Sequence, residues 1–383
     1  MSAEPGSAAG GLRHTTFFAP PPSHGPYVLE QDQGKKLTVA SSQSAFTVLA
    51  DGNATKGAYT AVQLRTGADE PLFPHYHRET HDVWYVTKGR VKVWLNNSCR
   101  VLNVGDFASA PPNTVHTISP LSNDNEFVGI VAPASWFRFF DIVGEPYAAG
   151  PLYPWSDPRP FPLEKIAAAK EANIDVVPIE GYTYPPAEPF SPGTKDRLPE
   201  DTSAYYLQAD SGPLYLLNSQ ACAPLCLAQN TNGDFAMSVI TGLGPRSRFP
   251  EFKGARPANE SGVFVGGRWL VLDNVDTMFR VLNGKVKFKV LRGRGTESEG
   301  EGESREVADV LTAEESIFVP RGVPFRFLIL SSFAKVLVFS GGEGIERLFI
   351  ANGRKGAPRE NVGEMDDKTV FDLRVDGVEA RFV

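Results

Sequence analysis

The feature that most constrains this chain is the spacing of three histidines and one aspartate between residues 73 and 120. His75 and His77 are one residue apart, Asp82 follows after a short gap, and His116 comes later, behind a Pro-Pro-Asn sequence. Alternate side chains of a β-strand share a face, so the first two histidines point the same way if this stretch is extended. Glycines divide the alternating runs that follow and predict hairpin turns that bring His116 back to the first pair. The stretch therefore predicts paired β-strands that carry four ligand-type side chains to one place.

Three imidazoles and one carboxylate form a donor set for a transition metal. The chain has six histidines. Three of them fall in this pattern, which favours one mononuclear divalent metal over the alternative of half-exposed strand histidines. The donor set accepts copper, iron, manganese, nickel, cobalt or zinc, so by itself it does not identify the metal. His81 lies next to Asp82 on the opposite strand face, and we expect it at the surface or behind the ligands.

Length and composition bound the fold class. A chain of 383 residues can build two domains with substantial cores. Its 36 glycines and 31 prolines, with short runs of β-branched and aromatic residues, are typical of an all-β fold with many turns. The net charge of −7 argues against nucleic acid and anionic membranes as partners. No apolar run is long enough to span a bilayer, and three cysteines do not indicate a disulfide framework.

The pattern along the chain predicts four segments. Residues 1–25 are rich in Gly, Ala, Ser and Pro without the features of a signal peptide, so we expect a flexible N-terminal arm and a cytoplasmic protein. Residues 26–150 form the predicted N-terminal domain with the metal site. Residues 151–204 form a Pro-rich connector with one helix from Leu163 to Asn173. Residues 205–383 form the predicted C-terminal domain, which lacks metal ligands.

An internal repeat relates the two predicted domains. Residues 276–290 match 81–95, with Gly284 at the position of Gly89, and residues 319–325 match the segment around His116. In this alignment Leu272, Thr277 and Phe325 take the positions of His77, Asp82 and His116. The second domain therefore repeats the scaffold without its ligands, and we expect one metal per chain. Residues 296–306 form an acidic insertion without apolar side chains that we expect to be disordered.

The two motifs resemble those of the cupin superfamily. The spacing H-x-H-x4-D-x6-G, followed by G-x5-P-x-N-x2-H, is similar to the two cupin consensus motifs, with Asp82 where cupins usually have Glu and Asn113 in place of the more usual Gly. The resemblance implies an all-β chain of two cupin jelly-roll β-barrels, joined by the Pro-rich connector with its short helix. Two motifs in register are a far more specific signal than a lone H-x-H.

A two-cupin chain with ligands only in its first barrel resembles the fungal quercetin 2,3-dioxygenases. The likeness covers most of the chain and includes segments 212–220 and 332–340. It implies a copper ion held by three histidines and an acidic residue, here His75, His77, His116 and Asp82, and it implies that the acid also takes the proton of the flavonol hydroxyl. Asp82 is one methylene shorter than the usual Glu, and the secretion signal of the fungal enzymes is missing. An intracellular relative acting on another phenolic or polyketide-derived enol is therefore equally consistent.

The expected function is a metal-dependent dioxygenase that uses O2 on a small aromatic or enolic substrate, with Asp82 as the catalytic base. Trp84, Phe107 and Ile118 are candidate substrate-binding residues, with core packing as the alternative for each. The rival class is a non-oxidative cupin enzyme, an isomerase, decarboxylase or pericyclase, that uses the metal as a Lewis acid. The sequence does not determine the oligomeric state, and a homodimer is consistent with it.

Overall fold

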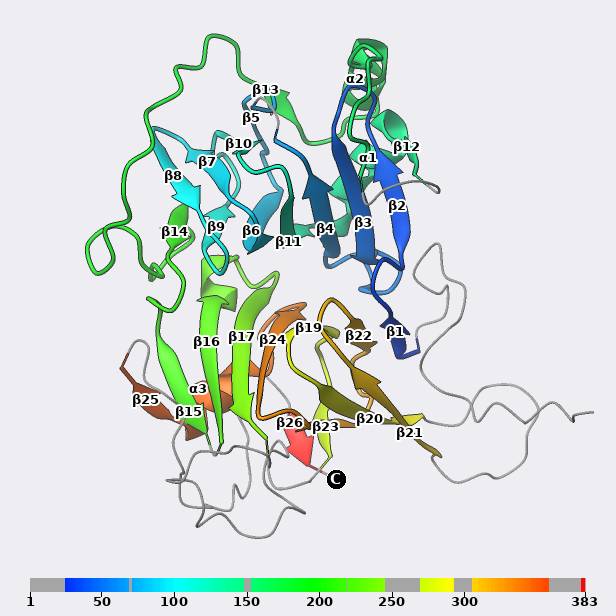
Figure 1. Cartoon of the computed structure of the whole chain (residues 1–383), viewed down its shortest axis with the longest axis vertical. Helices are drawn as coiled ribbons and strands as arrows, with labels where there is room; N and C mark the ends of the chain where they lie inside the picture. The colour runs from blue at the N-terminus through cyan, green and yellow to red at the C-terminus, as the bar shows by residue number, and fades with distance from the viewer. Residues whose placement is uncertain are drawn as a thin grey trace, which may run out of the picture.

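The computed structural model describes residues 25–68, 71–147, 153–217, 219–244, 269–292, 305–357 and 380–382. The predicted arm, apart from Gly25, and the predicted acidic insertion, apart from its last two residues, lie outside these ranges. The described chain forms four β-sheets, arranged as two halves stacked along the long axis of the molecule (Figure 1). Within these residues, no helix combines the length and apolarity needed to cross a lipid bilayer.

The first half contains two sheets that face each other. The larger sheet has the strand order β12-β2-β3-β4-β11-β6-β9-β14, and the smaller sheet has the order β13-β5-β10-β7-β8. Bounds in the larger sheet are Lys35–Thr38 for β2, Ser44–Ala50 for β3, Thr60–Thr66 for β4, His81–Lys88 for β6, Phe107–Ala110 for β9, Asn125–Ala132 for β11, Glu145–Pro146 for β12 and Tyr205–Leu207 for β14. Those in the smaller sheet are His75–Tyr76 for β5, Val91–Leu95 for β7, Ser98–Leu102 for β8, His116–Pro120 for β10 and Val177–Pro178 for β13.

The second half repeats this plan. Its larger sheet has the order β1-β22-β19-β24-β17-β16-β15-β25, and its smaller sheet has the order β21-β20-β23-β18-β26. Bounds in the larger sheet are Tyr27–Leu29 for β1, Leu214–Leu217 for β15, Gln220–Cys226 for β16, Ala236–Leu243 for β17, Thr277–Asn283 for β19, Ser316–Val319 for β22, Phe333–Ser340 for β24 and Arg354–Gly356 for β25. Those in the smaller sheet are Leu270–Leu272 for β18, Val286–Arg292 for β20, Arg305–Leu311 for β21, Phe325–Ile329 for β23 and Ala380–Phe382 for β26.

Both halves and the connector contain short helices. In the first half η1 (Ala134–Phe137) leads directly into α1 (Arg138–Val143), and in the second half η2 (Ala228–Asn230) and α3 (Glu346–Asn352) flank the larger sheet. The connector carries α2 (Leu163–Glu171), close to the predicted helix. The predicted all-β class, with two jelly-roll units and a helix-bearing connector, is confirmed.

Apolar side chains alternate along the strands, which explains why the two sheets of each half pack against each other around an apolar core. In β20 the side chains of Val286, Phe288 and Val290 are fully buried, while the lysines between them are only partly covered. This is the pattern expected of a strand with one buried face. Phe288 meets Phe279 of the facing larger sheet at a ring distance of 5.1 Å, so the apolar side chains of the two sheets fill the space between them.

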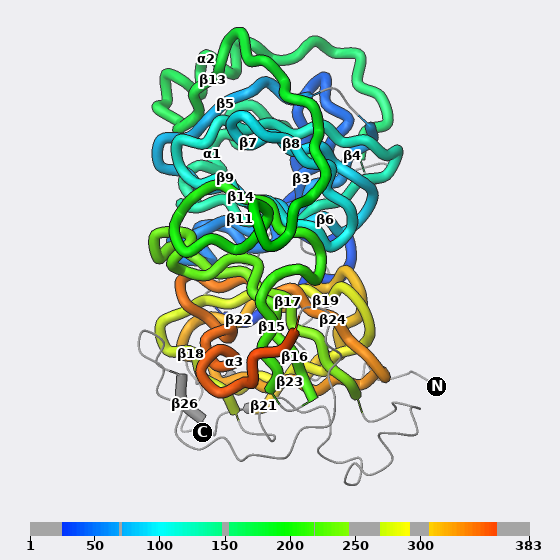
Figure 2. The backbone as a smooth tube through the Cα atoms, turned by 90° about the vertical axis from the view of Figure 1, so that its left-hand side faces the viewer, coloured from blue at the N-terminus to red at the C-terminus, as the bar shows by residue number. Residues whose placement is uncertain are grey.

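The two halves exchange edge strands. β1, from the start of the described chain, pairs with β22 of the second half, whereas β14 pairs with β9 of the first half. The two larger sheets also pack against each other through a buried cluster that includes Tyr27, Phe107 and Phe339. In Figure 2 the first-half segments (blue to cyan) accordingly lie directly on the second-half segments (yellow to orange). The division at residues 26, 151 and 205 stays a prediction about folding units, each of which receives a strand from the other.

A buried ion cluster also joins the halves. Arg65 and Glu126 of the first half pair at 2.7 Å, and Arg280 of the second half approaches the same carboxylate at 3.6 Å. Glu314, also from the second half, accepts from Arg65 at 2.5 Å and from Lys88 at 2.6 Å. Because Arg65, Glu126 and Arg280 are all almost fully buried, each charge depends on the others for compensation.

Candidate metal centre

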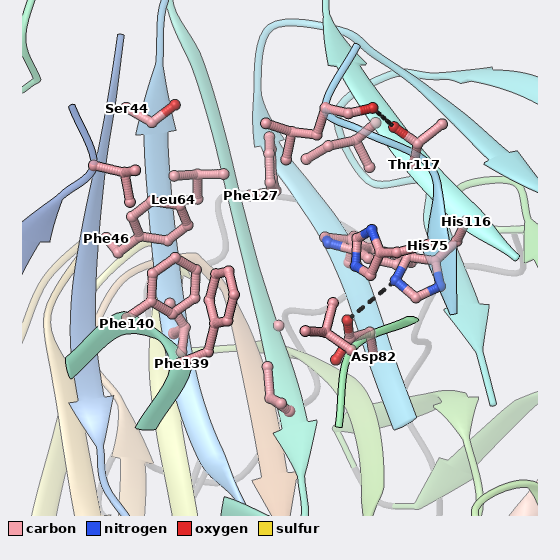
Figure 3. A pocket seen from close by; sticks show the side chains of 18 of the residues that line it. Ser44, Phe46, Leu64, His75, Asp82, His116, Thr117, Phe127, Phe139 and Phe140 are labelled. Carbon is pink, nitrogen blue, oxygen red and sulfur yellow. Dashed lines mark hydrogen bonds and ion pairs between the residues drawn. The ribbon is translucent and has the colours of Figure 1, made fainter. Parts of the chain in front are cut away.

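Three histidines from two paired strands converge inside the first half. His75 of β5 and His116 of β10 are direct register partners, and His77 follows β5 immediately. One ring nitrogen of each histidine lies within 4.8 Å of a ring nitrogen of the other two. The strands thus bring His116 to the pair formed by His75 and His77, as the sequence predicted, and Figure 3 shows His75 and His116 beside Asp82.

Backbone carbonyls fix the orientation of all three rings. Nδ1 of His75 lies 3.0 Å from the carbonyl oxygen of Phe73, and Nδ1 of His116 lies 2.9 Å from that of Thr114. Nδ1 of His77 meets the carbonyl oxygen of Asp175. A carbonyl can only accept, so each Nδ1 carries the proton and each Nε2 keeps its lone pair. This tautomer is the one in which a histidine ligates a metal through Nε2.

Asp82 of β6 completes the set from the facing sheet. Its Oδ2 lies 3.4 Å from Nε2 of both His77 and His116. With only Nδ1 protonated, these contacts set the lone pairs of Nε2 against those of the carboxylate, and a proton or a metal ion between them would relieve the repulsion. In agreement, the two Nε2 atoms and Oδ1 of Asp82 are buried without a hydrogen-bond partner among the described residues. The donor set and its unsatisfied atoms fit one metal ion, and nothing in them selects which metal.

The titration behaviour of the cluster also favours a positive charge at its centre. Burial, reinforced by His116 and His77, holds the pKa of His75 well below its usual value. Burial also opposes charge on His77, but attraction to Asp82 raises the pKa of that ring. For Asp82 burial alone would raise the pKa, yet His77 and His116 hold it far below its usual range. The carboxylate is therefore ionised and stabilises a cation placed between it and the rings.

The cluster opens into a cavity of about 180 Å³ between the two sheets of the first half. Two predicted substrate-binding residues, Trp84 and Ile118, line it together with Asp82. Most of the remaining wall is apolar or aromatic and comes from β3, β4, β11 and the η1–α1 segment, including Phe46, Leu64, Phe127, Trp136, Phe139 and Phe140 (Figure 3). Among the described residues no lysine or arginine lines the cavity.

The prediction that Phe107 lines this cavity is wrong. Phe107 is fully buried between the two halves, where its ring lies 5.8 Å from that of Tyr205. The pleat is the reason, because Ala108 of β9 pairs with Trp84 and shares its inner face, so Phe107 must point outward. The same alternation turns His81 away from the metal ligands, as expected. His81 is not at the surface, however, since it is buried with Nε2 2.8 Å from Oγ of Ser109.

The second half reproduces the geometry of the site with core residues in place of the ligands. Leu270 pairs with Phe325 as His75 pairs with His116. Gly322 donates its N–H to the carbonyl of Leu272 at 2.8 Å, and Asn113 donates to that of His77 at 2.6 Å. The alignment predicted from the repeat is therefore correct in space. In the described part of the second half, Leu270, Leu272 and Phe325 are packed into the apolar core.

The Asn113 departure from the usual motif has a simple physical basis. Its φ is 65°, and that of Gly322 at the matching position is 76°. Both residues occupy the left-handed region, which glycine enters freely and asparagine tolerates better than most other residues. An asparagine at this position can therefore form the same turn as a glycine, and this turn brings His116 to the other two histidines.

The connector contributes residues to the site, although the sequence indicated only that its aromatic residues could anchor it on the domains. β13 pairs with β5, so that Val177 and Pro178 lie opposite Tyr76 and His75. Val176 and Phe161 line the cavity, and Asp175 orients His77. A Pro-rich segment has no periodicity from which such contacts can be predicted. Its aromatic residues were the only signal that it packs on the domain.

Comparison with known proteins finds one family model and several similar proteins. A family model described as a cupin domain matches residues 61–130. Quercetin 2,3-dioxygenase of Aspergillus japonicus is 22% identical over 362 residues, covering 86% of this chain and 93% of that protein. Quercetin 2,3-dioxygenase of Bacillus subtilis (strain 168) is 31% identical over 147 residues, which is 38% of this chain and only 42% of the length of that protein. Among solved structures, oxalate decarboxylase from Bacillus subtilis matches with a TM-score of 0.48 at 12% identity, over 84% of this chain and 78% of that one.

The described chain has two jelly-roll halves and a histidine cluster suited to one metal ion in the first half, and the part that carries most of this cluster's strands is similar to a cupin domain. Its sequence is similar to quercetin 2,3-dioxygenases, to one over most of the chain and to another over part of it.

Proposed function

We propose that this protein is a metal-dependent dioxygenase that cleaves a neutral aromatic enol, a flavonol or a related phenolic or polyketide-derived compound, with O2. The observation that carries the proposal is the chemistry of the cavity. A three-histidine, one-carboxylate cluster opens into a space walled by aromatic and aliphatic side chains, without a lysine or arginine among the described lining residues. Such a cavity favours a flat apolar substrate, whereas a small dicarboxylate would find no lysine or arginine to pair with the carboxylate that the metal leaves free.

His75, His77 and His116 would hold the metal, with Asp82 as a fourth ligand or as the group beside it. When bound, the metal would supply Lewis acidity that lowers the pKa of an enol oxygen. Copper is the ion that the quercetinase likeness favours, and iron, manganese, nickel, cobalt and zinc are compatible with the same donors.

Asp82 is proposed as the base that accepts the proton of the substrate hydroxyl. Its Oδ1 is buried and has no hydrogen-bond partner among the described residues, and Asp82 lines the cavity. Its low pKa keeps it ionised but makes it a weak base, so proton acceptance would depend on a bound metal lowering the pKa of the substrate hydroxyl. In the overall reaction both atoms of O2 enter the products and the substrate supplies the electrons, so no external reductant is needed.

The walls of the cavity would orient the substrate and exclude water. Trp84 lies beside His116 at a ring distance of 5.4 Å, and Trp136 lies beside His77 at 5.0 Å. A planar substrate between these indoles and Ile118 would present its enol edge to Asp82. The remaining apolar wall keeps water from the electron-rich carbon that meets O2.

An oxygen-electrode assay of the metal-loaded protein tests the proposal. We expect O2 uptake with flavonols or polyketide enols, at one O2 per substrate consumed, and none with oxalate as the anionic control. Substrate conversion without O2 uptake would contradict the dioxygenase assignment and support the non-oxidative Lewis-acid class instead.

A further inference from the structure

The chain between α2 and β13 places one residue, Asp175, against the metal centre. Asn173, with φ of 54°, turns the chain at the end of α2, and the N–H of Ile174 donates to the carbonyl of Ala169 at 3.0 Å. Ile174 and Val176 then pack against the apolar cluster that contains Trp136. Asp175 lies between these two anchors, so its position is set by packing on both sides.

The main-chain carbonyl of Asp175 connects a ligand to a wall of the cavity. It accepts the Nδ1–H of His77 and, at 2.9 Å, the Nε1–H of Trp136. The rings of His77 and Trp136 also meet edge to face at 5.0 Å. One carbonyl thus holds both a metal-binding ring and the indole beside it, and rotation of either ring would break a hydrogen bond.

The side chain of Asp175 holds the turn between the two motif strands. Its carboxylate accepts the backbone N–H groups of Arg78, Glu79 and Thr80 at 2.7, 2.8 and 3.0 Å, and the hydroxyl of Thr80 at 3.1 Å. Residues 78–80 are the link between His77 and the strand that carries Asp82. Four donors from three consecutive residues thus converge on one carboxylate, which holds the backbone of the turn in place.

We infer that Asp175 is a positioning residue of the metal centre: through its carbonyl and its carboxylate it fixes the distance and angle between His77 and Asp82. This inference rests on the proposed metal site but not on the identity of the reaction. Partners of metal-ligating histidines typically change metal affinity by about 10- to 100-fold when lost. A loss in this range is therefore expected when the carboxylate no longer holds the turn.

The test compares Asp175→Asn and Asp175→Ala with the wild-type protein, using Cu²⁺ as the probe. Asn keeps the size of the side chain but replaces one acceptor oxygen by an amino group that faces backbone donors. We expect Cu²⁺ affinity, measured by competition with a chelator, to fall about 10-fold for Asp175→Asn and up to 100-fold for Asp175→Ala. The electron paramagnetic resonance spectrum of the bound Cu²⁺ should change with it, because the angle of the His77 ring changes.

Asp201→Asn is the matched control, since Asp201 also lies on the connector and accepts a backbone N–H, that of Ser203 at 3.0 Å, away from the site. It should leave affinity and spectrum unchanged. Urea denaturation of each apoprotein distinguishes a folding defect from a metal-site defect. If Asp175→Ala does not fold, the comparison uses Asp175→Asn alone. Wild-type affinity and spectrum in a folded Asp175 variant, even one of lower stability, would overturn the inference. If the wild type takes up no O2 while the affinity still falls, the reaction assignment fails and the inference stands.

Discussion

Asp82→Asn is expected to abolish most turnover while leaving metal bound to the three histidines. The change preserves size and removes the charge that accepts the substrate proton, and a positioned base typically contributes about 10²- to 10⁴-fold to a rate. We therefore expect kcat to fall by about 100-fold or more, with metal content near that of the wild type. Steady-state O2 uptake measures kcat, and metal analysis of the same sample measures the metal content.

The control for Asp82→Asn is Asp106→Asn, because Asp106 is also buried in the first half but bonds to the backbone of Asn103 and Ala209 outside the cavity. Its kcat should stay close to the wild-type value. Asp82→Glu restores the acid usual in the family and should shift activity toward flavonols. Wild-type turnover by Asp82→Asn would show that the carboxylate is a bystander and would favour the Lewis-acid class.

Glu126→Gln is expected to cause the largest loss of stability. Glu126 neutralises Arg65 and Arg280 from the two halves, and removing one partner of a buried ion pair typically costs about 3–5 kcal/mol. Burial opposes ionisation, but Arg280 and Arg65 lower the pKa of Glu126 to about 2. A folded-state pKa below the unfolded value means that the stabilisation is complete above the unfolded pKa of about 4.3 and is lost as pH falls toward 2. Urea denaturation at pH 7 and at pH 3 should therefore show a smaller difference between variant and wild type at the lower pH.

Asp141→Asn provides the comparison for that loss. Asp141 pairs with Lys35 at 2.6 Å, but both side chains are about half exposed, so the change should cost less than about 1 kcal/mol. Equal losses for the buried and the exposed pair would contradict the role assigned to the ion cluster.

Strand periodicity made the centre of the site predictable from the sequence. His75 and His77 share a face because of the pleat, and the repeat located Leu272 and Phe325 at the matching positions of the second half. The same rule could not place Phe107, because the face of a short strand such as β9 depends on its register with β6. Register is set by pairing across the sheet rather than by local sequence.

Strand periodicity and the internal repeat could not predict which connector residues belong to the site. Asp175 and Trp136 are brought together by contacts between segments distant in sequence, and neither belongs to a periodic run. The exchange of β1 and β14 between the halves is equally non-local, since each strand pairs with an element from the other end of the chain or across the connector. Local pattern and the internal repeat therefore predicted two related all-β units, and the cupin resemblance predicted their jelly-roll form, while tertiary packing decided how the units share edge strands.

The most direct test of the central claim is the metal content of the purified chain after saturation with Cu²⁺ and removal of unbound ion. One site, built from His75, His77, His116 and Asp82, predicts one metal ion per chain in the wild type and almost none after His77→Ala. Two ions per chain, or full occupancy that survives His77→Ala, would contradict a single centre in the first half.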